Sequence, residues 1–228
     1  MGNVFIYAAA EGIAQTAPCK DDIAIFCDGG IKYAIHGKDA GKKLVMGDFD
    51  SSLRDNVPED CEIFVYPVRK NKTDLELALD KATEFNPERV FVYGACGGER
   101  PDQYFANVML MAYAAGLNLN CVMSDGEYSY FALKESEARI ACETAPVYYF
   151  AEKEEQGTAE NRKHLSVYAL TDSIITLKGV DYEADRIALK PGITLGVSNA
   201  IIKDALIRAD KGTILIIGRF PPDRIRLC

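Results

Sequence analysis

The sequence predicts an α/β N-terminal domain with a mainly parallel sheet, followed by an all-β, sandwich-like C-terminal domain. Two observations carry this prediction. In the first half of the chain, short runs of β-branched and aromatic residues alternate with segments of helical periodicity, as in strands joined by crossover helices. After about residue 125 the helical periodicity fades, and apolar runs follow one another across turn residues. We therefore expect domains at residues 1–125 and 126–228.

Five short apolar runs in the first half are expected to be strands buried on both faces. They are residues 4–8, 23–27, 44–46, 63–66 and 90–93.

Two helices are expected in the first half. The first spans residues 73–85 and begins with a T-x-x-E capping box formed by Thr73 and Glu76. The second begins near Pro101 and runs to Gly116, because proline suits the first turn of a helix and glycine suits its end.

The second half contains closely spaced apolar runs that are expected to be strands of an antiparallel sandwich. These runs are residues 128–133, 147–150, 165–170, 174–177, 193–197, 205–207 and 214–217. The segment 152–163 is highly charged and lacks apolar periodicity, so we expect a solvated loop there.

Composition excludes several classes of protein. The 228 residues carry a net charge of −8, which argues against a general nucleic-acid surface, because such binding depends on lysine and arginine. The first residues show no basic leader and no apolar run approaches the length of a membrane span, so we expect a cytoplasmic location and no membrane partner. Seven cysteines without a C-x-x-C pair are expected to be reduced thiols, and only two histidines are present, which argues against a zinc site.

Polar clusters follow four of the predicted strands. Strands of a parallel sheet present their carboxyl ends at one edge, so these clusters are expected to converge there. The clusters are Asp28-Gly29-Gly30, Gly47 to Ser51 with Asp48 and Asp50, Thr73-Asp74, and Gly94 to Gly98 followed by Arg100 and Asp102. An isolated D-x-D pair would more often form a turn. Five acids at one sheet edge instead indicate a site for a divalent cation, most often Mg²⁺, together with phosphate.

The order and spacing of these motifs resemble those of the thiamin pyrophosphokinase family over nearly the whole chain. The matching motifs are D-G-G at Asp28, G-D-F-D-S at Gly47, K-x-K-T-D-L-E-L-A-L at Lys70, G-A-x-G-G followed by R-x-D-Q and A-N, G-x-x-Y at Gly179 and G-V-S-N at Gly196. The resemblance implies transfer of a pyrophosphoryl group from ATP to thiamine, with release of AMP. It also implies a Mg²⁺ requirement and a two-domain homodimer whose sites are shared across the interface.

The resemblance implies three groups of site residues. The catalytic group is Asp48, Asp50, Asp74, Arg100 and Asp102, of which Asp48, Asp50 and Asp74 would bind the metal. The ATP-binding group is Asp28, Gly29, Gly30, Lys72, Thr73, Gln103 and Asn107. The thiamine-binding group is Tyr182, Ser198 and Asn199, which belong to the C-terminal domain.

Several of these residues also suit other roles. Thr73 and Asp74 also suit a helix cap, and Arg100 could pair with Asp102 instead of phosphate. Asn71, Ile31-Lys32 and an extra Glu99 depart from the family pattern. A Mg²⁺-dependent phosphatase, a nucleotide-sugar transferase and a non-catalytic sensor of thiamine or nucleotide are the alternative functions. Either Asp74 or Asp102 could serve as the general base.

Overall fold

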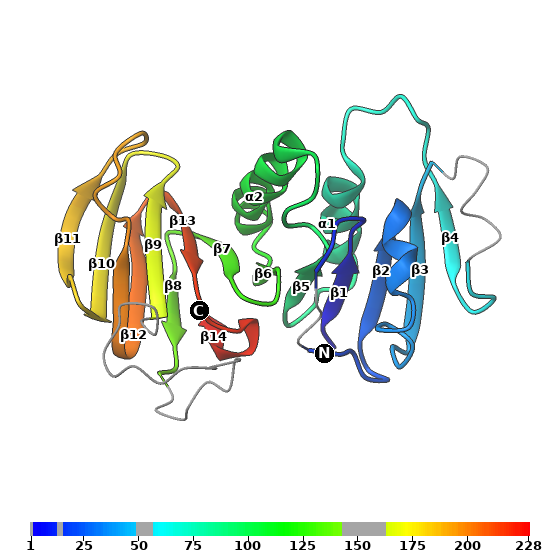
Figure 1. Cartoon of the computed structure of the whole chain (residues 1–228), viewed down its shortest axis with the longest axis horizontal. Helices are drawn as coiled ribbons and strands as arrows, with labels where there is room; N and C mark the ends of the chain where they lie inside the picture. The colour runs from blue at the N-terminus through cyan, green and yellow to red at the C-terminus, as the bar shows by residue number, and fades with distance from the viewer. Residues whose placement is uncertain (1, 13–15, 49–56, 143–162) are drawn as a thin grey trace. The chain divides into compact units, whose positions relative to one another are not determined.

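The computed structural model describes residues 2–12, 16–48, 57–142 and 163–228 (Figure 1). The chain divides into two compact units. The first unit comprises Met1–Ala132 and Pro221–Asp223, and the second comprises Leu133–Phe220 and Arg224–Cys228. The change falls after Ala132, within strand β7 (Ser129–Lys134), whereas the sequence analysis placed it after residue 125.

The sheet of the first unit is mainly parallel. Its strands lie in the order β7-β6-β5-β1-β2-β3-β4, and all neighbours are parallel except β6 and β7. The remaining bounds are β1 (Val4–Tyr7), β2 (Ile23–Cys27), β3 (Lys42–Gly47), β4 (Glu62–Val65), β5 (Val90–Tyr93) and β6 (Cys121–Ser124). All five predicted strands of this half are therefore present, but β4 is not buried on both faces as predicted, since Ile63 and Val65 are exposed at the edge of the sheet. β6 is a strand that the sequence analysis did not identify.

Two α-helices and a short 3₁₀ helix accompany this sheet. Helix α1 (Asp74–Thr83) contacts β1, β2 and β3, and it buries Leu75, Ala78, Leu79 and Ala82 at helical spacing. Helix α2 (Pro101–Gly116) contacts β6 and α1. Both predicted helices are confirmed. The 3₁₀ helix η1 (Asp28–Tyr33) forms where the sequence analysis expected only a glycine-rich loop.

An aromatic core lies against one face of the first sheet. Phe5 stacks on Phe91 with ring centroids 5.0 Å apart, and Tyr7 stacks on Phe26 at 5.3 Å. Ile31 of η1 packs into the same cluster. Side chains alternate across a strand, so Ile6, Ile25 and Leu44 point to the opposite face. These strands are buried on both sides, which makes their loops, rather than their faces, the accessible part.

The second unit is built from antiparallel strands, and no α-helix occurs in its described part. Strand β12 (Asn199–Lys211) pairs with β9 through residues 199–201 and with β8 through residues 205–208, while β10 lies along its other edge. β13 pairs with β9, β14 with β8 and β11 with β10. Their bounds are β8 (Glu137–Ile140), β9 (Lys163–Ala169), β10 (Ser173–Val180), β11 (Ala184–Leu189), β13 (Thr213–Gly218) and β14 (Ile225–Leu227), with a 3₁₀ turn η4 (Pro222–Arg224).

One strand prediction in this half is wrong. Residues 193–197 form turns, in which the Ile193 amide donates to Lys190 and the Val197 amide donates to Thr194. Pro191-Gly192 and Gly196 interrupt the apolar run. Its backbone amides therefore form hydrogen bonds within turns and do not pair with a neighbouring strand. Predicted strand 147–150 and most of predicted loop 152–163 lie outside the described residues, and Lys163 begins β9. The sequence analysis missed β8, β11 and β14.

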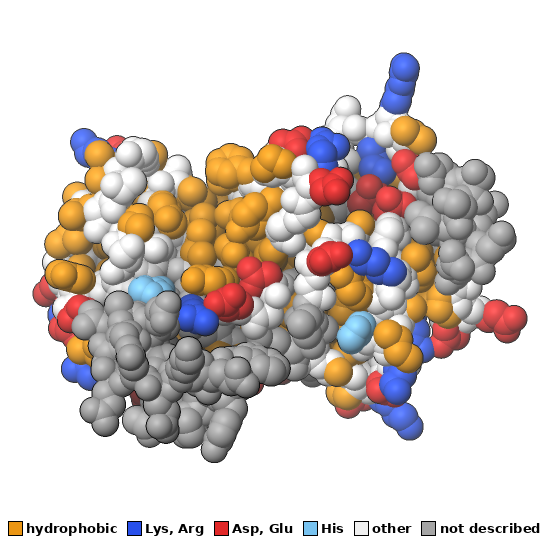
Figure 2. All heavy atoms as spheres, viewed as in Figure 1, with side chains coloured by type: hydrophobic (Ala, Val, Ile, Leu, Met, Phe, Trp, Pro, Cys, Tyr) orange, Lys and Arg blue, Asp and Glu red, His pale blue; other side chains and the backbone are white. Residues whose placement is uncertain are grey.

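Apolar side chains also reach the surface (Figure 2). In the second unit Tyr182, Leu195 and Ile202 are 73%, 69% and 61% exposed. In the described part of the chain, no helix is long and apolar enough to cross a membrane.

Candidate active site

The loops that follow β1, β2, β3 and β5 meet at the carboxyl edge of the first sheet. Because these strands are parallel neighbours, their ends lie side by side (Figure 1). Backbone hydrogen bonds tie the loops together: the Ala8 amide donates to the Tyr93 carbonyl at 2.8 Å, and the Ala10 amide donates to the Gly94 carbonyl at 2.7 Å. The described residues that directly follow β2, β3 and β5 therefore lie at one edge of one sheet.

Two glycines permit this convergence. A Cβ atom at Gly30 would lie 2.0 Å from the carbonyl oxygen of Tyr7, so no side chain fits there. Gly94 has a φ of +65°, and its Cβ would lie 2.4 Å from the Ala8 carbonyl oxygen. Gly29 is less confined, since its Cβ would lie 3.0 Å from the Ala9 side chain. The D-G-G and G-A-x-G-G motifs therefore have a packing role that is independent of any ligand.

Asp28 and Asp48 stand on neighbouring strand ends. Asp28 has a φ of +46°, an uncommon conformation for a residue with a side chain. A Cβ atom at Gly47 would lie 3.2 Å from Asp28 Cα, which means that the two backbones are in contact just before Asp48. Asp50, the other acid of the D-x-D motif, lies outside the described residues.

Helix α1 begins beside these two acids. The Thr73 hydroxyl accepts a hydrogen bond from the Glu76 amide at 3.2 Å, which confirms the predicted N-cap. The Cys27 thiol, at the end of β2, donates to the backbone carbonyl of Asp74 at 3.7 Å. The end of β2 and the first turn of α1 are therefore in contact.

The electrostatic environment of Cys27 supports the same grouping. Burial is the main reason that its pKa is raised, and the neighbouring charges of Asp74 and Asp28 raise it further, while Lys70 opposes them. The Lys70 ammonium lies 2.8 Å from Asp74 Oδ1. Asp28, Asp74 and Lys70 thus surround one buried thiol. Lys70 was missing from the predicted site list, although its i,i+4 spacing from Asp74 is a signal that could have selected it.

These acids have the oxygen ligands that a hard divalent cation prefers. Asp74 Oδ1 is buried, and the Lys70 ammonium 2.8 Å away places a cation beside it. Within the described ranges, however, no group of three His, Cys, Asp or Glu side chains is arranged to hold a metal ion. Asp48 and Asp74 are thus two suitable ligands on adjoining elements, and Asp50 is not described.

Lys72, predicted to bind ATP, contacts protein side chains in this structure. Its ammonium donates to Asp80 Oδ2 at 2.5 Å and to the Tyr113 hydroxyl at 2.9 Å, and it lies 3.5 Å from Glu76. The hydrogen bond that Lys72 donates to Asp80, followed by the one that it donates to Tyr113, raises the pKa of Lys72. Lys72 therefore links α1 to α2, and Lys70 is the lysine that lies beside Asp74 and Asp28.

Arg100 and Asp102 form a bidentate pair at the start of α2. The distances are 2.9 Å from Nε to Oδ1 and 2.6 Å from the terminal nitrogen to Oδ2. The Arg100 guanidinium holds the pKa of Asp102 at about 2, well below its ordinary value. Pairing with Asp102 was the alternative interpretation for Arg100, and it is the arrangement observed.

Two further residues of α2 had been assigned to ATP binding. Gln103 is exposed in the first turn of the helix. The Asn107 side-chain amide instead donates to the Ala95 carbonyl at 2.9 Å, so it holds the glycine-rich loop after β5. Beyond it, Tyr104 donates to Tyr130, whose hydroxyl donates to Asp125 at 3.1 Å. The sequence analysis missed this network, because its members are far apart in the chain.

The three predicted thiamine contacts lie in the second unit and differ in exposure. Tyr182 is 73% exposed, whereas Asn199 is 5% exposed. Asn199 Oδ1 accepts from the amides of Tyr182 and Ala200, and its Nδ2 donates to the Tyr182 carbonyl. Ser198 has a φ of +63°, and its amide donates to the Ser166 hydroxyl at 3.2 Å. Asn199 therefore positions Tyr182, and the exposed side chains of Tyr182 and Ser198 are the ones open to a ligand.

Comparison with known proteins agrees with this arrangement. Residues 16–123, which include the acids and the two helices, match the family described as thiamin pyrophosphokinase, catalytic domain. A thiamine pyrophosphokinase of Bacillus subtilis (strain 168) is 29% identical over 163 residues, which cover 69% of this chain and 68% of that protein.

Solved structures show the same fold over almost the full length. The thiamine pyrophosphokinase from Bacillus subtilis has a TM-score of 0.72 at 24% identity, covering 95% of this chain and 98% of that one. The thiamin pyrophosphokinase from Candida albicans has a TM-score of 0.70 at 13% identity, covering 96% and 89% of the two chains. Residues 16–123 therefore match the catalytic domain of the thiamin pyrophosphokinase family, and the chain shares the fold of solved thiamin pyrophosphokinase structures.

Proposed function

We propose that the protein transfers the pyrophosphoryl group of ATP to the hydroxyethyl oxygen of thiamine, giving thiamine diphosphate and AMP. The observation that carries the proposal is the grouping of Asp28, Asp74 and Lys70 around the end of β2, next to Asp48, within the part of the chain that matches the catalytic domain. A set of acids with one lysine suits a polyphosphate that arrives with a divalent cation, since phosphoryl transfer depends on positioning and charge neutralisation.

Asp48 and Asp74, together with Asp50, are the proposed ligands of Mg²⁺. When bound, the ion would neutralise charge on the phosphate oxygens. Lys70 is placed to contribute a further positive charge, and the first turn of α1 favours phosphate through its free amide groups. Arg100 would exchange Asp102 for a phosphate oxygen, because its planar fork suits either anion.

The acceptor must lose a proton as it attacks. In the proposed step the thiamine oxygen forms a bond to the β-phosphorus of ATP, the bond from that phosphorus to the α,β-bridging oxygen breaks, and AMP leaves. The hydroxyl proton passes to a carboxylate. Asp74 and Asp102 are the two candidate acceptors, and Asp102 becomes available once Arg100 exchanges it for a phosphate oxygen.

We further propose that residues 1–125 bind ATP and Mg²⁺, and that residues 126–228 form a sandwich-like domain for thiamine binding and dimerisation. Antiparallel pairing and exposed Tyr182 in the second unit support this division. Each site of the homodimer would combine acids of one chain with Tyr182 of the other. A cytoplasmic location remains a prediction from the sequence.

Product analysis tests the reaction. The protein is incubated with ATP and Mg²⁺, with and without thiamine, and the nucleotides are separated by chromatography. Thiamine-dependent AMP is expected. Thiamine-dependent ADP would refute pyrophosphoryl transfer, and hydrolysis that needs no acceptor would favour a phosphatase. Turnover only with a sugar nucleotide would favour a glycosyl transferase, and thiamine binding without turnover would favour a sensor.

A mixing experiment tests the shared site. Asp48→Asn and Tyr182→Ala should each be nearly inactive, and subunit exchange between them should restore activity in hybrid dimers. With random pairing at equal amounts, half of the dimers are hybrids with one intact site of two, so recovery should approach roughly a quarter of wild-type activity. Exchange proven by native mass spectrometry without recovered activity would show that each chain builds its own site.

A further inference from the structure

A hollow of about 370 Å³ lies in the second unit, between β8, β12 and β14. Three arginines, four apolar residues and one acid line it. The lining includes Arg139, Arg224, Arg226, Ala141, Leu206 and Asp204. In a chain with a net charge of −8, three guanidinium groups around one hollow are a local reversal of charge.

The strand register brings two of these arginines together. Arg226 of β14 lies directly opposite Arg139 of β8, and Leu206 of β12 lies opposite Arg139 on the other side. Residues directly opposite one another in an antiparallel pair point to the same face, and like charges in that position destabilise the pair. The register therefore maintains an unfavourable contact that an anion between the two side chains would relieve.

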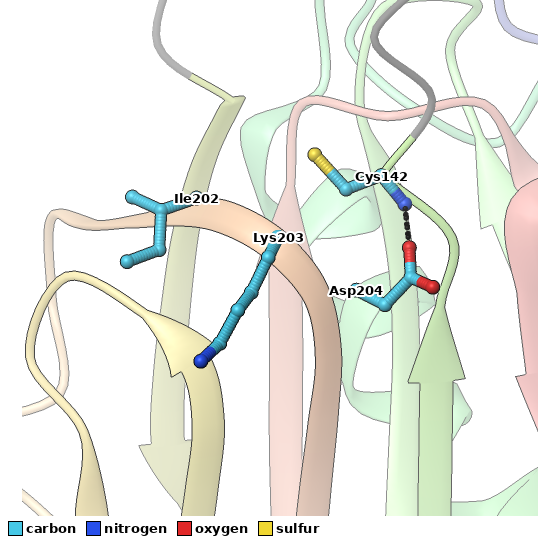
Figure 3. A pocket seen from close by; sticks show the side chains of 4 residues that line it. All are labelled: Cys142, Ile202, Lys203 and Asp204. Atoms are coloured by element: carbon cyan, nitrogen blue, oxygen red, sulfur yellow. Dashed lines mark hydrogen bonds between the residues drawn. The ribbon is translucent and has the colours of Figure 1, made fainter.

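Acids balance only part of the charge of the opposed pair Arg139 and Arg226. Arg139 lies 3.2 Å from Glu137 but remains 66% exposed, and no ion pair of Arg226 occurs among the residues that the structure describes. Asp204 also lines an adjacent hollow, where its carboxylate is turned toward the Cys142 amide and accepts its hydrogen bond at 2.8 Å, while Lys203 extends away from it (Figure 3). The acid at the edge of the arginine hollow is thus already engaged with the backbone.

We propose that this hollow is a binding site for a small phosphate-bearing anion. A guanidinium fork binds phosphate through two parallel hydrogen bonds, and the opposed pair can grip one phosphate from both sides. Leu206 and Ala141 offer an apolar surface for the rest of the ligand. The volume falls within the range of roughly 300–1,000 Å³ that is usual for small-molecule sites. All of these residues belong to the second unit, so the site does not include the proposed catalytic acids.

The test is a titration of the full-length protein with inorganic pyrophosphate, in chelator so that no divalent cation is present. Backbone amide signals of Arg139, Ala141 and Arg226 in ¹H–¹⁵N NMR spectra report binding at this hollow and not elsewhere. In the wild type these signals should shift in a saturable way. Arg139→Gln with Arg226→Gln should weaken the affinity roughly tenfold or more, since two charge-assisted contacts are lost.

Two matched variants separate the site from general charge effects. Lys190→Gln with Lys211→Gln removes two positive charges from exposed lysines of the same unit outside the hollow, and it should bind pyrophosphate as the wild type does. Arg139→Lys with Arg226→Lys keeps the charge but loses the planar forks, so its affinity should fall between the other two. Any of three results would overturn the proposal. The amide signals at the hollow could fail to shift, Arg139→Gln with Arg226→Gln could bind pyrophosphate as tightly as the wild type, or Lys190→Gln with Lys211→Gln could weaken binding equally. Well-dispersed spectra confirm that each variant is folded.

Discussion

Asn199→Ala should destabilise the second unit, although Asn199 was first identified as a substrate contact. The side chain is 5% exposed and makes three hydrogen bonds, at 3.0 Å from the Tyr182 amide, 2.8 Å from the Ala200 amide and 2.9 Å to the Tyr182 carbonyl. Alanine would leave these backbone groups without their partner. The turn between β10 and β11 would then lose its connection to the start of β12.

The expected loss in the free energy of unfolding is about 2 to 3 kcal/mol, at roughly 1 kcal/mol per hydrogen bond with a reduction where water can reach the turn. Tyr182→Ala removes a side chain that is 73% exposed, and its effect should stay within about 0.5 kcal/mol. Asn199→Asp retains the Oδ1 acceptor and loses the Nδ2 donor, so it should lie between the two. The three variants thus separate a positioning role from a contact role.

Urea unfolding followed by far-UV circular dichroism measures the difference, because the chain contains no tryptophan for fluorescence. With an m-value of about 2 kcal/mol per M, the Asn199→Ala midpoint should fall by roughly 1 M. Thiamine KM should rise in both Asn199→Ala and Tyr182→Ala. A midpoint for Asn199→Ala within about 0.2 M of wild type would refute the positioning role, and Asn199 would then have to act on the substrate directly.

Further outcomes follow from the first unit. Asp48→Asn should lose most activity at saturating Mg²⁺ while the circular dichroism spectrum is unchanged; full activity would make Asp48 a turn residue only. Because Arg100 stabilises the Asp102 carboxylate, Asp102 should lose its charge only as the pH falls through about 2. Arg100→Gln should return the pKa of Asp102 toward 3.8, which ¹³C NMR of the carboxyl group can measure. An equal Asp102 pKa in the wild type and the variant would contradict the ion pair. Burial raises the pKa of Cys121 to about 12 and also raises the pKa values of Cys27 and Cys96. Iodoacetamide should therefore modify the exposed Cys19 and Cys228 first, as mass spectrometry can show. Early modification of Cys27 would contradict the packing of α1 on β2. Asn71→Asp should retain activity, since it restores the residue expected from the family pattern, and a collapse in kcat would show that Asn71 has a different role here.

The strands and helices of the first unit could be predicted because each carries a strong local signal. Val4–Tyr7 and Val90–Tyr93 are continuous apolar runs buried on both faces, and the Thr73 cap marks the start of α1. Residues 193–197 are apolar like a strand, but Gly192 precedes them and Gly196 interrupts them, and both glycines allow turns. Strands such as Ala184–Leu189 were missed because most of their side chains are exposed. An exposed strand does not need apolar residues, so its sequence lacks the apolar run that identifies a buried strand.

The candidate site could be predicted as a set of acids at one sheet edge, but individual roles depend on contacts between distant segments. The sequence cannot distinguish Lys70 from Lys72, since which lysine reaches Asp74 and which reaches Tyr113 is decided by the packing of α1 against α2. The engagement of Asn107 with Ala95 and of Asn199 with Tyr182 is likewise set by the fold. Amide side chains near a ligand motif can serve the backbone instead.

Strand β12 has a consequence for how the second unit opens. Its first residues pair with β9 and its later residues with β8, while β10 follows it along the other edge. Breaking β12 away would therefore cost the pairing of three strands at once. Its amide protons should exchange with deuterated solvent only when the whole unit unfolds. Strands β11 and β14 each pair with one strand among the described residues, so their amide protons should exchange through local fraying.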